Sequence, residues 1–229
     1  MLRYILLDVD DTILDFRKSQ DEAIKYMLDY FGVFIDESMP EVYHECNAKC
    51  WRAYERGEIS QAEIFPLRFK LLFDHYGIDT VPYMDAEHIY HPKLDTLAYP
   101  RDGAMDFLSK IVERYHVYII TNGAMRTQDM RLSKSGIADM VDGIFISERV
   151  GFSKPNIRFF EAVRDSIDGF DERDAVVIGD SLTSDIRGGN NADIRTIWYN
   201  PKSMPNTTDV RPDYIATSYE EILEILQTL

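Results

Sequence analysis

Five short apolar runs, each ending in polar residues, most constrain how this 229-residue chain can fold. Such runs are too short for a core helix, and their content of β-branched residues is typical of strands that are buried on both faces. Strands of this kind occur in parallel sheets that are covered by helices. The five runs are residues 3–8, 116–121, 143–147, 175–180 and 195–199.

Segments with helical periodicity lie between these runs. Apolar residues recur every three or four positions over residues 104–115 and 159–167, which predicts two helices that each bury one face. A further strand at 213–216 and a helix at 219–226 are predicted near the end of the sequence. The alternation of strands and helices predicts a doubly wound α/β fold with a parallel sheet.

One segment interrupts this alternation. From about residue 16 to residue 92 the sequence has helical periods and no convincing strand pattern. We therefore predict an α/β core domain made of residues 1–15 and 93–229, with residues 16–92 inserted as a helical cap domain. Hinge motion is expected near residues 15–18 and 94–100, where the chain passes between the two domains.

Several residues of the inserted segment mark predicted helix ends. Gly32 and Gly77 are positioned to end helices in the left-handed conformation that glycine tolerates. Ser60 and Glu63 have the spacing of a capping box at a helix start. Pro66 lies inside the helical period that follows, so a kink or a split is expected there.

Composition and charge narrow the class of protein. With 45% hydrophobic residues the chain can bury a normal core, whereas its longest apolar stretches fall far short of the roughly 20 residues that span a membrane. There is no signal-peptide pattern at the N-terminus, and we expect a cytoplasmic protein without a membrane partner. The net charge of −15 disfavours a nucleic-acid partner, because such surfaces need clustered Lys and Arg.

The cysteine pattern carries little functional information. Cys46 and Cys50 are four positions apart in a helical stretch, an arrangement that is poorly oriented for a disulfide. His44 lies close to them, but without a second Cys or His cluster these residues are interpreted as ordinary helix residues rather than as a metal site.

Polar residues close the predicted strands. In an open α/β sheet, ligands bind outside the carboxyl ends of the strands. Four carboxylates are expected to converge there, and they would repel one another strongly unless a divalent cation lay among them; Mg²⁺ is usually held by carboxylates and substrate phosphate oxygens. The candidate residues are Asp8, Asp10, Thr121, Asn122, Lys154, Asp180 and Asp185. Taken singly, each such Asp can equally be a turn cap.

The pattern resembles the haloacid dehalogenase superfamily. Its four motifs appear in order as residues 8–12, Thr121, Lys154, and residues 179–180 with Asp185. This family also places a helical cap directly after its first motif, so the resemblance covers essentially the whole chain. The resemblance implies a Rossmann-like core and Mg²⁺-dependent phosphoryl transfer.

The resemblance also implies a role for each candidate. Asp8 would be the nucleophile that forms an aspartyl-phosphate, and Asp10 would protonate the leaving group and then activate water. Thr121 and the main-chain N–H of Asn122 would bind phosphoryl oxygens, and Lys154 would neutralise charge beside Asp8. The alternative for Lys154 is a solvated loop lysine.

The same resemblance implies four metal ligands. Asp8 and Asp180 would bind Mg²⁺ directly, Asp185 would bind it directly or through water, and Asp10 would use its main-chain carbonyl. Asp10 also separates branches of the superfamily, since transport ATPases have Thr at this position and dehalogenases lack the acid. It therefore favours phosphatase or phosphomutase chemistry.

Within the superfamily the chain is similar to the pyrimidine 5'-nucleotidase subgroup. The similar stretches are residues 179–186, 188–189, 191–192 and 198–201, and the cap segment 47–73. Asp193 departs from the Gly that is usual in that subgroup. Trp51 can be a ring that stacks on a base, as can Tyr43 and Tyr54, but aromatic residues at helical spacing more often form a core.

The leading hypothesis is thus a Mg²⁺-dependent nucleoside 5'-monophosphate phosphatase whose substrate is a small phosphorylated metabolite, a pyrimidine nucleoside monophosphate. A sugar-phosphate or general metabolite phosphatase is the second enzyme hypothesis, and a mutase is a weaker one. A catalytically silent protein that binds a phosphorylated ligand is the alternative from another class. The expected state is a monomer or a homodimer.

Overall fold

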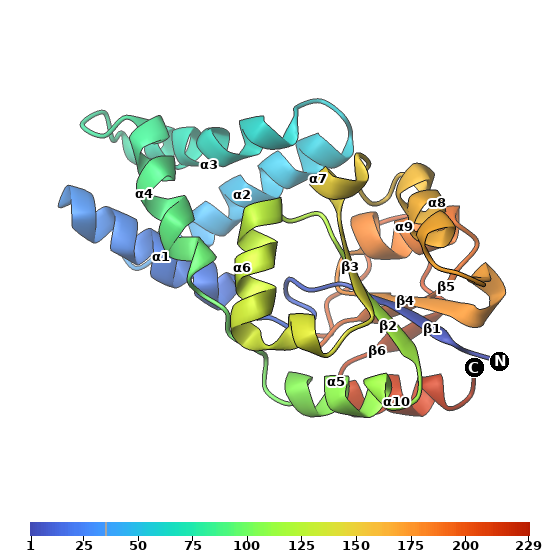
Figure 1. Ribbon diagram of the computed structural model, residues 1–229. Helices are drawn as coiled ribbons and strands as arrows, with labels where there is room; N and C mark the ends of the chain where they lie inside the picture. The colour runs from blue at the N-terminus through green and yellow to red at the C-terminus, as the bar shows by residue number, and fades with distance from the viewer. Residues whose placement is uncertain (35) are drawn as a thin grey trace. The chain divides into compact units, whose positions relative to one another are not determined.

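A computed structural model describes residues 1–34 and 36–229 of the chain (Figure 1). The chain divides into two compact units, an α/β unit of Met1–Asp15 and Ala98–Leu229 and a helical unit of Phe16–Leu97. The helical unit thus extends to Leu97 rather than to residue 92, because its last helix continues to Asp95.

The described residues of the α/β unit form one six-stranded sheet in which all neighbouring strands are parallel. The strand order is β3-β2-β1-β4-β5-β6, so the first strand lies in the middle. This confirms the predicted doubly wound α/β fold. The strands are β1 (Tyr4–Leu7), β2 (His116–Thr121), β3 (Gly143–Ile146), β4 (Ala175–Gly179), β5 (Arg195–Tyr199) and β6 (Tyr214–Ala216).

Each face of the sheet packs against its own helices. Alternate residues of β1 point to opposite faces, with Ile5 and Leu7 in one core cluster and Tyr4 and Leu6 in the other. Helices α5 (Ala104–Val112) and α10 (Tyr219–Leu226) lie side by side on the first face (Figure 1). Helix α8 (Ile157–Ser166) covers the second.

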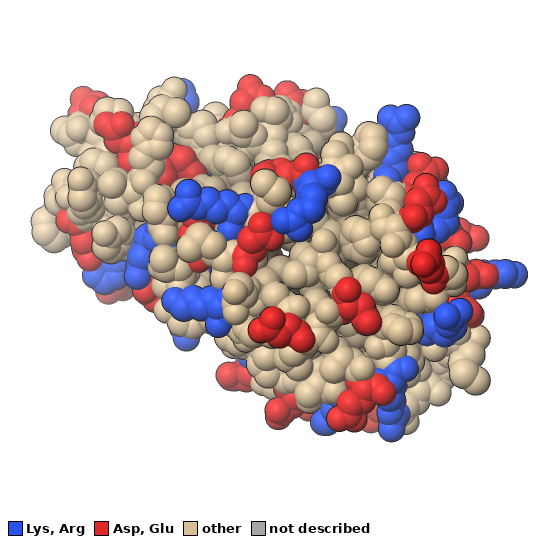
Figure 2. All heavy atoms as spheres, in the orientation of Figure 1, with Lys and Arg blue, Asp and Glu red and all other residues tan. Residues whose placement is uncertain are grey.

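The remaining helices of this unit are short or lie at the strand ends. They are α6 (Met125–Ser135), η1 (Ile137–Asp139), α7 (Ser147–Val150), η2 (Glu172–Asp174), η3 (Leu182–Ile186) and α9 (Arg187–Asn191). Among the described residues no helix is both long enough and apolar enough to cross a membrane. On the face shown in Figure 2, Lys and Arg side chains are interspersed with Asp and Glu rather than gathered into one basic stripe.

The helical unit consists of α1 (Phe16–Phe31), α2 (Met39–Glu55), α3 (Gln61–Tyr76) and α4 (Tyr83–Asp95). The predicted capping box is present, since Glu63 accepts hydrogen bonds from both the amide and the hydroxyl of Ser60. Gly32 and Gly77 both have φ of 66°, as predicted for the helix ends. Pro66 does not split α3: the helix continues past it, so that part of the prediction was wrong.

Candidate functional site

Asp8 follows β1 directly and is almost completely buried. The chain then turns back, because the amides of Ile13 and Leu14 both donate to the carbonyl of Val9 at 2.9 Å. The turn brings Thr12 over the strand end, where its hydroxyl donates to Oδ2 of Asp8 at 3.0 Å. One carboxylate oxygen of Asp8 is thereby fixed from within its own loop.

The last helix of the chain supports this loop. Tyr219, at the start of α10, donates its hydroxyl to the carbonyl of Thr12 at 2.7 Å. Its ring stacks on Phe107 and on Tyr199, with centroid distances of 4.8 and 5.0 Å. Asp11 has φ of 60°, a conformation that non-glycine residues seldom adopt, so the turn needs such support.

Lys154 joins two carboxylates of the site. Its Nζ lies 2.7 Å from Oδ1 of Asp8 and 2.7 Å from Oδ1 of Asp185, and it also donates to the carbonyl of Ile120 at 2.8 Å. Burial alone would lower the pKa of Lys154, but Asp185 and Asp8 outweigh it and raise the pKa above its usual value. Lys154 is therefore a buried cation and not a solvated loop lysine.

The electrostatics of the site favour a further cation. Burial, together with repulsion from Asp185, raises the pKa of Asp8 to about 7 although Lys154 opposes the shift. Burial also raises the pKa of Asp180 well above its usual value, with repulsion from Asp8 and Asp11 adding to it. The single ammonium group of Lys154 therefore does not balance the negative charge of these carboxylates.

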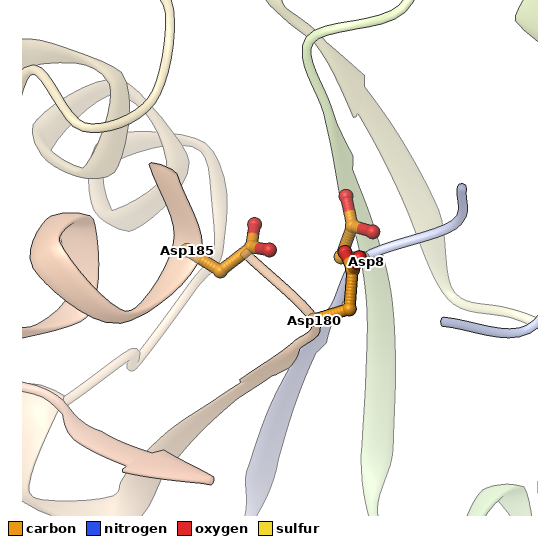
Figure 3. A group of neighbouring side chains, drawn as sticks. All are labelled: Asp8, Asp180 and Asp185. Atoms are coloured by element: carbon orange, nitrogen blue, oxygen red, sulfur yellow. The ribbon is translucent and has the colours of Figure 1, made fainter. Parts of the chain in front are cut away.

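Three of the carboxylates can share an ion. One oxygen from each of Asp8, Asp180 and Asp185 lies within 4.8 Å of the others, and Figure 3 shows the three groups turned toward one another. Three carboxylate oxygens suit a hard divalent ion that completes its shell with water and substrate oxygens. The donor set of this chain therefore fits Mg²⁺.

Asp185 reaches the group from the helical turn after β4. Its Oδ2 accepts a hydrogen bond from the amide of Ser181 at 3.1 Å, and the hydroxyl of Ser181 accepts one from the amide of Ser184. A Cβ at Gly179 would lie 2.3 Å from Oδ2 of Asp185, so only glycine leaves room for this carboxylate at the strand end.

Thr121 is the last residue of β2, and Asn122 follows it. The hydroxyl oxygen of Thr121 accepts hydrogen bonds from the amide of Gly123 at 3.1 Å and from Nε2 of Gln128 at 2.9 Å. The side chain of Asn122 donates to the carbonyl of Lys154 at 2.8 Å and accepts from its amide at 2.9 Å. Sequence reasoning considered only the main-chain N–H of Asn122 and missed this contact.

Comparison with known proteins decides the family. A family model described as a haloacid dehalogenase-like hydrolase matches residues 2–193. Pyrimidine 5'-nucleotidase PynA of Streptococcus pneumoniae is 37% identical, with 98% of this chain and 94% of that protein aligned. This chain belongs to the haloacid dehalogenase-like hydrolase family. It is a hydrolase.

Solved structures agree with this family. The HAD-hydrolase YfnB of Bacillus subtilis, in a crystal structure described as bound to magnesium, is 36% identical with a TM-score of 0.92, and the match covers 98% of both chains. The L-2-haloacid dehalogenase of Xanthobacter autotrophicus has a TM-score of 0.75 at 15% identity over the whole length of both chains. The latter similarity shows that the haloacid dehalogenase fold is shared.

In this haloacid dehalogenase-like hydrolase, the carboxylate of Asp10 is not part of the three-carboxylate group. Four carboxylates were expected to converge, but the side chain of Asp10 is bound by α6 instead. Nη1 of Arg131 donates to its Oδ1 at 2.5 Å, and Nε2 of Gln128 donates to its Oδ2 at 2.6 Å. Each of the two donors holds one oxygen of the carboxylate, and the predicted metal contact of Asp10 is through its main-chain carbonyl.

Gln128 and Arg131 were missed by sequence reasoning. A helix between two strands of a doubly wound sheet must bury one face, yet the segment 125–135 contains few apolar residues. The structure buries Gln128 and Arg131 and leaves Met125 and Met130 partly exposed. This shortage of apolar residues was the available sign that the helix buries polar ones.

The aromatic candidates of the helical unit differ in burial. Tyr43 is fully buried and donates its hydroxyl to Tyr90 at 2.9 Å, so it belongs to the packed interior of this unit. Trp51 and Tyr54 are half-buried and meet edge to face, with ring centroids 5.8 Å apart. Packing among the rings accounts for Tyr43, while a base-stacking role for Trp51 stays a hypothesis.

The cysteine segment lies on α2. Cys46 and Cys50 are free thiols on α2, and Nε2 of His44 lies 2.6 Å from a carboxylate oxygen of Asp21. In the described part of the chain, the group of acidic side chains at Asp8 is the one with metal-binding geometry.

Proposed function

We propose that the chain is a Mg²⁺-dependent phosphatase that hydrolyses nucleoside 5'-monophosphates, preferentially those of pyrimidines. The observation that carries the proposal is the carboxylate of Asp8, which shares the ammonium group of Lys154 with Asp185 and has Asp180 beside it. Asp10, absent from dehalogenases at this position, supports phosphate-ester rather than carbon-halogen chemistry.

The proposed reaction has two steps. In the first, an oxygen of Asp8 bonds to phosphorus as the ester P–O bond breaks, and Asp10 gives its proton to the departing oxygen. In the second, Asp10 takes a proton from water as the water oxygen bonds to phosphorus, and Asp8 is released with inorganic phosphate. Thr121 and the N–H of Asn122 would bind the phosphoryl oxygens throughout.

In both steps the negatively charged phosphoryl group lies beside negatively charged carboxylates, so positive charge is needed at the site. Mg²⁺ held by Asp8, Asp180, the carbonyl of Asp10 and, directly or through water, Asp185 would supply positive charge to the phosphoryl group and the carboxylates. Lys154 already contacts Asp8 and is placed to stabilise negative charge that is shared between Asp8 and the phosphoryl oxygens.

The named relatives support the choice of substrate. PynA of S. pneumoniae and YjjG of Escherichia coli, which is 28% identical over 97% of both chains, are both called pyrimidine 5'-nucleotidases. The glyceraldehyde 3-phosphate phosphatase of Methanopyrus kandleri, 29% identical over the whole chain, keeps a sugar-phosphate substrate as the second candidate. Monomer or homodimer remains part of the proposal, as does a cytoplasmic location, which the two free cysteines favour.

A substrate panel tests the proposal. The purified protein is assayed for phosphate release from dUMP, dTMP, UMP, AMP and glucose 6-phosphate, first with Mg²⁺ and then with EDTA. We expect the pyrimidine nucleotides to have the highest kcat/KM and EDTA to abolish turnover. A preference for glucose 6-phosphate would overturn the nucleotidase assignment and leave a phosphatase.

Two variants test the nucleophile. Asp8→Asn should lose turnover by a factor of about 10³ or more, whereas Asp168→Asn, an exposed aspartate of the same unit, should keep the wild-type rate. The alternative is a protein that binds dUMP without hydrolysing it. In that case the wild type would turn dUMP over no faster than Asp8→Asn does, and the two proteins would bind dUMP with the same affinity in Mg²⁺.

Movement of the helical unit is part of the proposed cycle. The YfnB structure is described as revealing interdomain movement. We expect the two junctions, near residues 15–18 and 94–100, to act as hinges whose movement excludes bulk water during transfer. Amide hydrogen exchange in both junctions should slow when vanadate, a phosphate analogue, is added with Mg²⁺, and unchanged exchange would contradict the hinge.

A further inference from the structure

Helix α6 buries two long polar side chains, Gln128 and Arg131, beside Thr127 and Leu132. Gln128 is 1% exposed and Arg131 is 0% exposed, while Met125 and Met130 on the same helix are 38% and 40% exposed. Burial of long polar side chains is unfavourable unless each finds partners. Gln128 and Arg131 must therefore be stabilised by polar partners on the buried face of α6, where Leu132 packs in the core.

The partner of this face is the carboxylate of Asp10. Gln128 and Arg131 are three positions apart and project from one side of the helix. Each takes one oxygen of Asp10, with Nη1 of Arg131 at 2.5 Å and Nε2 of Gln128 at 2.6 Å. A carboxylate held at both oxygens by different side chains has its rotamer fixed, although Asp10 itself is 22% exposed.

Gln128 also extends the contact to Thr121. Its Nε2 donates to the hydroxyl of Thr121 at 2.9 Å as well as to Asp10, and its Oε1 faces Nη1 of Arg131 at 3.4 Å. A Cβ at Gly123 would lie 2.1 Å from Nε2 of Gln128, so only glycine at this position of the turn leaves room for the amide group. One amide group thus bridges the ends of β1 and β2.

We infer that Gln128 and Arg131 are positioning residues that aim the carboxyl group of Asp10 at the departing oxygen of the substrate, and that Gln128 sets this aim relative to Thr121. The inference rests on the proposed phosphatase function. The proton that Asp10 carries passes to the ester oxygen as the P–O bond breaks and returns from water in the second step. A group that is misaligned by a free rotamer transfers this proton slowly.

Leaving-group dependence separates positioning from a merely structural role. Departure of p-nitrophenolate needs no proton, whereas departure of the nucleoside alkoxide does. The value of kcat/KM reports the steps up to departure of the leaving group. Gln128→Glu, which keeps the shape but replaces the donor by a carboxylate, and Arg131→Met should lower kcat/KM for dUMP by about 10²-fold or more. For p-nitrophenyl phosphate the loss should stay below about tenfold.

Matched variants complete the experiment. Arg131→Lys should recover part of the dUMP activity, because an ammonium group can still reach one oxygen of Asp10. Asp129→Asn, an exposed neighbour on α6, should leave both substrates unaffected. If Arg131→Met fails to fold, Gln128→Glu and Arg131→Lys carry the test. Equal losses on both substrates, or none, would overturn the inference.

A crystal structure of Gln128→Met distinguishes failure of this inference from failure of the proposed function. The carboxylate of Asp10 should leave its present rotamer or occupy several, and an unchanged Asp10 would overturn the positioning role. A wild-type protein that hydrolyses neither ester would overturn the phosphatase, and the orientation of Asp10 would then decide whether Gln128 positions it.

Discussion

The side-chain amide of Asn122 exchanges two hydrogen bonds with the main chain of Lys154, one to its carbonyl at 2.8 Å and one from its amide at 2.9 Å. This reciprocal pair of bonds resembles the bonding of two neighbouring strands, although Asn122 follows β2 and Lys154 lies in the loop between α7 and α8. The loop is thereby fixed at the point from which the lysine side chain reaches Asp8 and Asp185.

Removal of this amide should reduce activity more than stability. Asn122→Ala keeps the main-chain N–H but loses both bonds, and at about 1 kcal/mol for each bond kcat/KM should fall between tenfold and a hundredfold. Steady-state kinetics with dUMP checks this. Asn190→Ala, which loses a comparable bond to the carbonyl of Arg211, should retain full activity.

Lys154→Met should leave Asp8 and Asp185 without their shared cation. In EDTA the variant should lose about 3 kcal/mol of unfolding free energy, because buried charges are then uncompensated, and its kcat should fall by about 10² or more. Mg²⁺ should raise its melting temperature more than that of the wild type, since the metal replaces part of the missing charge. Equal increases in the two proteins, measured by thermal denaturation, would contradict this account.

The raised pKa of Asp8, about 7, gives a signed pH dependence. In the metal-free protein the folded state holds a proton that the unfolded state releases near pH 4, so this stabilisation is present at low pH and is lost as the pH rises toward 7 and above. In Asp8→Asn no group titrates at this position, so the stability of this variant lacks this pH dependence. The difference in unfolding free energy between Asp8→Asn and wild type should therefore grow by about 3 kcal/mol between pH 4.5 and 8 in EDTA, measured by urea denaturation.

Gly179→Ala should displace Asp185, because the new Cβ would lie 2.3 Å from its carboxylate oxygen. The Mg²⁺ concentration needed for half-maximal activity should rise at least tenfold. Gly143→Ala is the matched control, since its Cβ would meet only the ring of Tyr118, at 3.1 Å, at the amino end of β3. That variant should lose stability and keep its Mg²⁺ requirement, and a similar requirement in both variants would argue against Asp185 as a ligand.

Most of the sheet could be predicted because each strand is short, apolar and followed at once by polar residues. The predicted and observed limits agree at 116–121 and 195–199, and Asp8 and Asp180 lie just one residue beyond their strands. The predicted split at Pro66 was wrong, because α3 continues through this residue. Local sequence cannot reveal that tertiary packing stabilises a helix despite one lost hydrogen bond.

Only those site residues that belong to the sequence motifs could be predicted. Asp180 and Asp185 follow a strand, and the rule for open sheets brings such residues to one edge. Gln128 and Arg131 lie on the helix after β2 and belong to none of the motifs, and their spacing on a polar helix resembles that of any solvated face. Their role depends on which side of α6 is buried, and periodicity cannot supply this when the few apolar residues lie on both sides, with Leu132 buried and Met130 exposed.

The bond from Tyr219 to the carbonyl of Thr12 joins residues that are 207 positions apart. A ribosome must therefore add all of the intervening residues before the loop that carries Asp8 receives this support. The nascent chain holds its acidic loop without this brace until α10 has been synthesised.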